Sequence, residues 1–157
     1  MHVQQRQRAR TLVSPAFFER LVARVRADHG FARSLAERVV DQALAFLKAC
    51  ADNRGVPLSP SWHVDVGWHA FLLYTREYAE FCHQVAGRFI HHVPTDGPSS
   101  PPKVDMVDTV AAIIASGYDV DVELWEGPGR CDTDKCHGCA SGCHDDPPPI
   151  PPYRGAA

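Results

Sequence analysis

The sequence predicts an all-α protein, a small helical bundle of about four helices followed by a Cys-rich, Pro-rich C-terminal tail. Four segments repeat apolar residues at three- and four-residue spacing, which is typical of helices buried on one face. Serine, proline and glycine stand where such helices would begin and end. A chain of 157 residues is also long enough to bury a real core.

The composition changes along the chain predict four regions. Residues 1–13 are expected to be a flexible, polar arm, and residues 14–126 a helical domain. Residues 127–146 form a Cys/His-rich segment, and residues 147–157 are a Pro-rich tail of polyproline type. The arm contains arginines but no apolar stretch, so it does not have the pattern of a secretory signal.

The first two helices have recognisable ends. One is expected to start after the N-cap Ser14, with a proline in the first helical position, and to stop at Gly30. The next opens on Ser34 and Glu37, which have the spacing of a capping box, and closes at Gly55. Its apolar face consists of Val39, Val40, Ala43, Leu44, Phe46, Leu47 and Cys50.

A third helix is predicted as one piece from Ser61 to Gly87, followed by a loop rich in proline and serine. A fourth covers residues 103–117, with Met106, Val110, Ile113 and Ile114 directed inward. Residues 118–127 alternate in polarity but have no evident partner strand, so we expect an extended segment packed on the helices. The expected buried set is Phe17, Leu21, Leu44, Leu47, Phe71, Tyr78 and Ile113.

Charge and composition limit the classes of function. The formal net charge is −3, so no basic field indicates a nucleic-acid partner. No apolar stretch approaches the ~20 residues needed to span a bilayer, and we expect no membrane association. A cytoplasmic protein is the default expectation. Its six cysteines would then be mostly reduced, which favours metal or redox chemistry over a disulfide framework.

Asp65 and His69 stand one helical turn apart in the third segment, and the pair has two interpretations. On one continuous helix they share a polar stripe with Arg76, Glu80 and His83, which describes an ordinary solvated face. Alternatively, a carboxylate and an imidazole at this spacing can bind one divalent cation, or form an oriented pair for acid–base work. Spacing alone leaves both open.

The segment from Val64 to His92 resembles the glycine-rich domain-containing protein family of plants and its bacterial relatives. The resemblance rests on a V-D-x-x-W-H pattern and covers residues 30–95, although the long glycine-rich region is absent. Its matching positions are Val64, Asp65, Trp68, His69, Leu73, Tyr78, Cys82 and His92. The resemblance implies an α-helical domain with a polar cluster, and it implies no particular activity.

His91 and His92 are the second source of imidazoles. Neighbouring residues of extended backbone point in opposite directions, so at most one of the two joins a cluster. They can equally be two loop histidines, one packed and one solvated. We expect His92 to meet Asp65 and His69, with Trp68 and Tyr78 packed nearby, because a tryptophan beside the histidine brings apolar bulk to the polar stripe.

Four cysteines in the C-terminal segment have metal-ligand spacing: Cys131, Cys136, Cys139 and Cys143. A C-x-x-C turn lets two thiolates chelate one ion, and four thiolates complete a structural zinc site. Zinc is favoured over an iron–sulfur cluster, whose plant-type spacing needs a more distant fourth cysteine. A retroviral-type knuckle would need a cysteine where Pro149 stands. An unstructured thiol-rich tail is the remaining alternative.

Three classes of function follow from these patterns. The first is a small intracellular, zinc-binding helical protein. The second is a metal-dependent or acid–base enzyme centred on Asp65, His69 and His92, with Tyr78 nearby. The third is a structural module that binds an unknown protein partner, in which both clusters are incidental.

Overall fold

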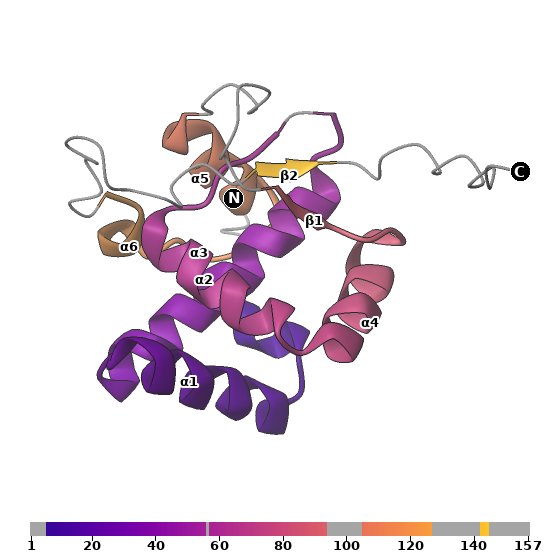
Figure 1. Cartoon of the computed structure of the whole chain (residues 1–157). Coiled ribbons are helices and arrows are strands. Elements are labelled where there is room, and N and C mark those ends of the chain that lie inside the picture. The colour runs from indigo at the N-terminus through magenta and orange to yellow at the C-terminus, as the bar shows by residue number, and fades with distance from the viewer. Residues whose placement is uncertain (1–5, 56, 94–104, 127–141, 145–157) are drawn as a thin grey trace, which may run out of the picture.

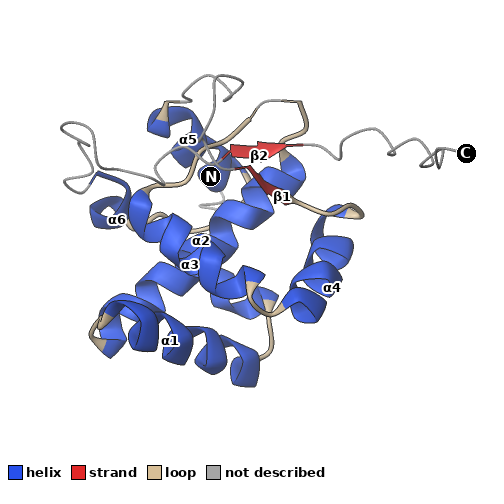
Figure 2. Cartoon of the chain, viewed as in Figure 1, coloured by secondary structure: helices blue, strands red, loops and turns tan. Residues whose placement is uncertain are grey.

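The computed structural model describes residues 6–55, 57–93, 105–126 and 142–144, and within them it is almost entirely helical. A short 3-10 helix, η1, precedes the α-helices, and two three-residue strands complete the set (Figures 1 and 2). The elements are η1 (Ala9–Leu12), α1 (Pro15–His29), α2 (Arg33–Asp52), α3 (Trp62–Leu72), α4 (Thr75–Ala86), β1 (His91–Val93), α5 (Met106–Ala115), α6 (Val122–Glu126) and β2 (Gly142–His144). The predicted all-α class is confirmed, with six α-helices in the described residues.

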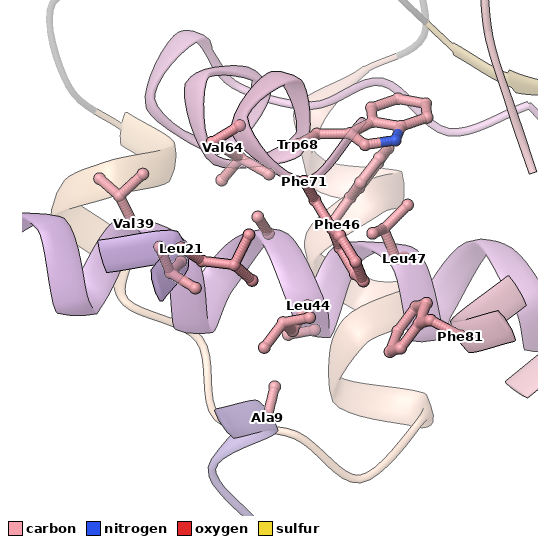
Figure 3. Packing of buried hydrophobic residues seen from close by; sticks show 14 of the residues in the cluster. Ala9, Leu21, Val39, Leu44, Phe46, Leu47, Val64, Trp68, Phe71 and Phe81 are labelled. Carbon is pink, nitrogen blue, oxygen red and sulfur yellow. The ribbon is translucent and has the colours of Figure 1, made fainter. Parts of the chain in front are cut away.

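Helix α2 is the centre of the bundle, because α1, α3, α4, α5 and η1 all pack against it (Figure 1). Its residues from Val39 to Leu47 are buried without interruption, so the helix contacts neighbours on every side. Figure 3 shows the interface with α3, formed by Val64, Trp68, Phe71, Val39, Phe46 and Leu47. All seven residues predicted to be buried are buried.

Gly67 sets how closely α3 approaches α2. A Cβ atom added to Gly67 would lie 2.7 Å from the Cβ of Ala43 and 3.0 Å from the carbonyl oxygen of Val39. Real side chains do not tolerate the first distance, and the second involves backbone that cannot move aside easily. Glycine at this position therefore allows the axes of α2 and α3 to approach closely at the turn that carries Asp65 and Trp68.

The helix ends agree only partly with the predictions. Ser14 caps α1 by accepting a hydrogen bond from the Phe17 amide at 3.2 Å, and Gly30 ends it with φ +67°. The predicted capping box on α2 is wrong, because the helix already starts at Arg33 and Ser34 lies inside it. Glu37 instead forms an ion pair with Arg33, at 2.9 Å.

The predicted third helix is two helices. α3 ends at Leu72, and Tyr74 leaves the helical region with φ −95° and ψ 68° before α4 begins. The Tyr74 ring packs edge-on against Phe17 of α1, at a centroid distance of 5.4 Å, while Leu73 is left exposed. The bend is a tertiary effect without glycine or proline, so the periodicity of the sequence does not reveal it.

The edges of the domain also differ from expectation. Within the arm predicted to be flexible, η1 packs on α2 and Ala9 is buried, while the backbone of Gln7 pairs with that of Tyr118. Ile114 of α5 was predicted to point inward and is exposed. The segment expected to be extended becomes the helix α6 from Val122 onward.

The two strands pair in antiparallel fashion and lie above α4 in the view of Figure 1. β1 lies in the stretch predicted to be a loop, and its partner β2 follows much later in the chain. In the register His91 stands opposite His144, and His92 opposite Cys143. None of the helices that the structure describes is both long and apolar enough to cross a bilayer.

Candidate metal centre

Three side chains from two elements converge on one point at the surface of the bundle. The Nε2 atom of His92 lies 2.9 Å from Oδ1 of Asp65 and 2.8 Å from Nε2 of His69. The second carboxylate oxygen of Asp65 is 3.4 Å from Nε2 of His69. These are the residues that the sequence predicted to cluster, and among the described residues they form the one group with the donor atoms of a metal site.

Helix α3 supplies Asp65 and His69. Ser61 caps this helix by accepting a hydrogen bond from the Val64 amide at 3.3 Å, so Asp65 falls in the first turn, where the helix dipole favours a carboxylate. His69 follows four residues later, which places its ring over the same face. The close approach of Gly67 to α2 fixes the distance between this face of α3 and the core.

The chain between α4 and β1 places His92. Gly87 ends α4 with φ +67°, and the guanidinium of Arg88 then donates to the carbonyl oxygens of Cys50 and Ala51 at the end of α2. Ile90 is buried, and its carbonyl oxygen accepts a hydrogen bond from the Tyr78 hydroxyl at 2.6 Å. With these anchors, the extended backbone of β1 turns His92 toward α3.

Burial differs among the three side chains. Those of Asp65 and His92 are only 10% and 11% exposed, whereas that of His69 is 56% exposed. The fully buried Trp68 forms the inner wall, because its ring lies 4.5 Å from the His92 ring, centroid to centroid. The cluster is therefore closed on the core side and open to solvent beside His69. The solvated-face interpretation is wrong for Asp65.

No arrangement of protons gives a linear hydrogen bond at both close contacts of His92 Nε2. Each imidazole nitrogen presents either one N–H or one lone pair. If only His92 Nε2 carries a proton, its single N–H points either at Asp65 Oδ1 or at the lone pair of His69 Nε2, and the other acceptor has no linear hydrogen bond. If only His69 Nε2 carries it, the lone pair of His92 faces Asp65 Oδ1, and protons on both nitrogens collide across 2.8 Å. Every placement leaves at least one close contact unmatched.

The electrostatic surroundings favour neutral imidazole at His69. Burial is the main cause that lowers the pKa of His69, and the positive charges that His92 and His29 can carry lower it further, against the opposing effect of Asp65. A neutral ring leaves a nitrogen lone pair available as a ligand. Burial also raises the pKa of Tyr78, so its hydroxyl remains a neutral hydrogen-bond donor beneath the cluster.

Other predicted site residues are placed differently. The ring of His91 packs against Phe89, at a centroid distance of 4.8 Å, so His92 alone of the two joins the cluster. Cys131, Cys136 and Cys139 lie outside the described residues, and for Cys143 only the backbone is described. One exposed aromatic residue beside the cluster, Trp62, was not predicted to contribute. The sequence feature that could have pointed to Trp62 is its position three residues before Asp65.

The fold and the cluster together define a small helical protein with two histidines and one carboxylate at a common point. A family model described as UCP032817-like matches residues 7–105, so the chain belongs to the UCP032817-like family. A search of curated proteins found no match, and a search of solved structures found none either.

The family match corrects the resemblance to glycine-rich domain-containing proteins. That resemblance rested on eight positions between Val64 and His92, whereas the family model covers most of the helical domain, from the N-terminal segment onward. The eight positions include core residues such as Trp68, Tyr78 and Cys82, which are buried here. A shared pattern of core and cluster residues over one short segment is weaker evidence of membership than a match over the domain.

Proposed function

We propose that this protein binds one divalent transition-metal ion through Asp65, His69 and His92 and leaves coordination positions open for water or a substrate. The observation that supports the proposal is the convergence of the two Nε2 atoms and the carboxylate, which no placement of protons satisfies. The lone pairs of the two nitrogens and of the carboxylate repel one another. A cation bound between them would attract all three.

The spacing of the donor atoms supports the same conclusion. Nitrogen and oxygen ligands about 2.0–2.2 Å from one ion lie about 3.0 Å apart at right angles and about 3.4 Å apart at the tetrahedral angle. The two Nε2 atoms are 2.8 Å apart, and the two oxygens of Asp65 have separations of the same size, Oδ1 lying 2.9 Å from His92 and Oδ2 3.4 Å from His69. Small rotations of the exposed His69 side chain are enough to admit an ion, because its ring is free on the solvent side.

The number of ligands and the open side favour a reactive site over a structural one. Structural zinc sites are closed by four protein ligands, whereas catalytic sites use three and keep a position for water or substrate. A set of two histidines and one carboxylate also serves iron(II) in oxygenases. Such an ion polarises bound oxygen groups or activates water. The chain contributes the inner wall of Trp68, which keeps solvent to one side.

Metal binding is tested by loading the full-length, metal-free protein with Co²⁺ and comparing it with Asp65→Asn, His69→Ala and His92→Ala variants. Nitrogen and oxygen ligands give weak visible bands, while thiolates add strong near-ultraviolet absorption, so the cysteines are distinguished from this site. We expect one set of nitrogen/oxygen bands that each variant abolishes. His83→Ala, which removes an exposed histidine of α4, is the matched control and should keep them.

Two results would contradict the proposal. One is a wild-type protein without nitrogen/oxygen bands at saturating Co²⁺. The other is a spectrum that survives in all three variants. In the first case the Asp65–His92 hydrogen bond of 2.9 Å would instead support an acid–base pair, with the carboxylate orienting the ring.

A second metal site is proposed from the sequence alone, at Cys131, Cys136, Cys139 and Cys143. The spacing of the four cysteines supports a closed thiolate site for zinc. Backbone pairing of β2 with β1 brings the end of this segment beside the Asp65, His69 and His92 cluster.

A further inference from the structure

Four rings gather on the surface where the end of α1 meets the start of α3. The Trp62 ring lies 5.0 Å from that of His63, 6.1 Å from Phe31 and 6.3 Å from His29, as distances between centroids. Phe31 also contacts His29, at 5.5 Å, and His63, at 6.2 Å. We call these four residues the aromatic patch.

The aromatic patch is open to solvent at its centre. The Trp62 side chain is 46% exposed, which is unusual for so large an apolar group, and His29 is exposed beside it. Because nearly half of Trp62 is exposed, part of its indole remains available to a ligand. Indole and phenyl rings bind flat unsaturated groups through area and through ring-to-ring contacts.

The aromatic patch continues directly into the metal centre along α3. Trp62, Asp65 and His69 are three and then four residues apart, so they fall within one narrow stripe of the helix. Residues three or four apart on a helix are neighbours on its surface, so Trp62 lies next to Asp65 and Asp65 next to His69.

The composition of the aromatic patch disfavours a cationic ligand. No carboxylate belongs to the patch itself, so the aromatic cage that recognises quaternary ammonium groups is a poor analogy. Neutral or anionic flat groups fit better.

We infer that the ligand of this site is an aromatic compound with adjacent oxygen donors, such as an aryl acid or a phenol derivative. Its oxygens occupy the open positions of the metal ion, and its ring stacks on Trp62. This inference rests on the proposed metal-binding function, and it adds the class of compound that the site accepts. Trp62 is the residue that determines this specificity, because it is an exposed ring one helical turn from Asp65.

Two hydroxamates test the inference, because they carry identical oxygen donors and differ in the attached group. Acetohydroxamate has a methyl group and benzohydroxamate has a phenyl ring. Each is titrated into the Co²⁺-loaded full-length protein, and the visible bands of the nitrogen/oxygen site are followed. We expect benzohydroxamate to bind about tenfold more tightly. A cyclohexyl hydroxamate, equally large but not flat, should lose most of that advantage.

Variants assign the advantage to the aromatic patch. Trp62→Ala should reduce the ratio of the two affinities nearly to one while acetohydroxamate binds as before, and Trp62→Phe should retain much of the ratio. Val107→Ala, which removes an exposed apolar side chain from α5, is the control and should change neither affinity.

The outcomes separate this inference from the proposed function. If acetohydroxamate fails to change the Co²⁺ bands at all, the metal centre lacks open positions, and the proposed function is overturned. If both hydroxamates bind equally, or if the phenyl advantage persists in Trp62→Ala, the aromatic patch is not part of the ligand site. The metal-binding proposal then stands without it.

Discussion

The indole N–H of Trp68 donates a hydrogen bond to the hydroxyl oxygen of Tyr78, 2.9 Å away, inside the core. That hydroxyl in turn donates to the carbonyl oxygen of Ile90 at 2.6 Å, two residues before His92. The relay joins the helix that carries Asp65 and His69 to the strand that carries His92. The geometry of the Asp65, His69 and His92 cluster therefore depends on a buried tyrosine outside the cluster.

Replacing Tyr78 with phenylalanine should weaken both the fold and the site. The substitution leaves the Trp68 N–H and the Ile90 carbonyl buried without this partner, at a cost of about 1–3 kcal/mol for each group. We expect the free energy of unfolding to fall by about 2–4 kcal/mol in urea titrations. Affinity for Co²⁺ should fall as well, because β1 loses an anchor next to His92.

Tyr74→Phe is the control for the loss of a hydroxyl group. Tyr74 is only partly buried and lies outside the relay, with its ring packed on Phe17 and beneath the guanidinium of Arg20. It should cost less than about 0.5 kcal/mol. Equal losses in the two variants would show that the relay has no special role.

Gly67→Ala should destabilise the domain in spite of the better helix propensity of alanine. The propensity gain is about 1 kcal/mol. The new methyl group would meet Ala43 at 2.7 Å and the Val39 backbone at 3.0 Å, so α3 must move away from α2. Such overpacking costs about 1–3 kcal/mol, and the shift moves Asp65 and His69 relative to His92.

The double variant Gly67→Ala, Ala43→Gly identifies the cause. Removing the Ala43 methyl group relieves the closer of the two contacts, so it should recover part of the lost Co²⁺ affinity. Thermal unfolding alone is less informative here, since the Ala43→Gly change weakens α2 by itself. Affinity that stays unchanged in Gly67→Ala would show that the helix separation does not govern the site.

Local patterns predicted that Asp65, His69 and His92 lie together, but they did not predict what surrounds the three residues. The one-turn spacing of Asp65 and His69 and the alternation of β1 are short-range properties, and they correctly place these side chains with His92. The bend at Tyr74 is set by contact with Phe17, which lies far away in the sequence. The predicted polar stripe required one continuous helix that aligned Asp65 with Glu80. Because the chain bends after Leu72, the two residues do not share one helix face.

The N-terminal segment shows the same limit of sequence reasoning. Polar composition predicted a flexible arm, yet the backbone amide of Arg10 donates to Oδ1 of Asp41 on α2, at 2.9 Å. Asp41 is 1% exposed and lies in a stretch of α2 that reads as apolar. A buried carboxylate needs a hydrogen-bond donor, and here a backbone amide from another segment supplies it. The composition of the N-terminal segment does not reveal this pairing.

Asp41 predicts a pH-dependent stability. Burial raises the pKa of Asp41, and its Oδ2 atom has no hydrogen-bond partner among the described residues. A raised pKa means that the folded state binds the proton more tightly than the unfolded state does. The contribution of this group is therefore present at low pH and is lost as the pH rises from the unfolded value, near 3.8, through the folded one.

Asp41→Asn should consequently raise the melting temperature at pH 7. The amide oxygen can still accept from Arg10, while the cost of burying a charge is removed. The increase should shrink as the pH is lowered toward the unfolded-state value near 3.8, because the wild-type carboxyl then takes up its proton. Asp28→Asn is the control, because Asp28 pairs with Arg24 at the surface, and it should give no such increase. A melting temperature that falls at pH 7 in Asp41→Asn would contradict the assignment.

The two proposed metal sites should be independent in their ligands. We expect about two metal ions per chain in protein purified without chelator, one at each site. His69→Ala should remove the ion at Asp65 and His92 and leave the thiolate-bound one. Replacing Cys136 and Cys139 with serine should do the reverse, because a C-x-x-C pair contributes half of a closed four-thiolate site. Metal content by mass spectrometry and Co²⁺ spectra of the two variants measure this directly.

Helical structure gives the complementary readout. The hydrophobic core of the described residues is formed between Ala9 and Trp125, so we expect the cysteine variant to retain its far-ultraviolet circular dichroism and its cooperative unfolding. His69→Ala should lose more than the ~0.5 kcal/mol of an ordinary surface substitution, because it leaves the buried Asp65 carboxylate with one partner fewer. If one substitution removes both ions, the sites share ligands. In that case the pairing of β1 with β2, which sets His92 opposite Cys143, is the place to look for them.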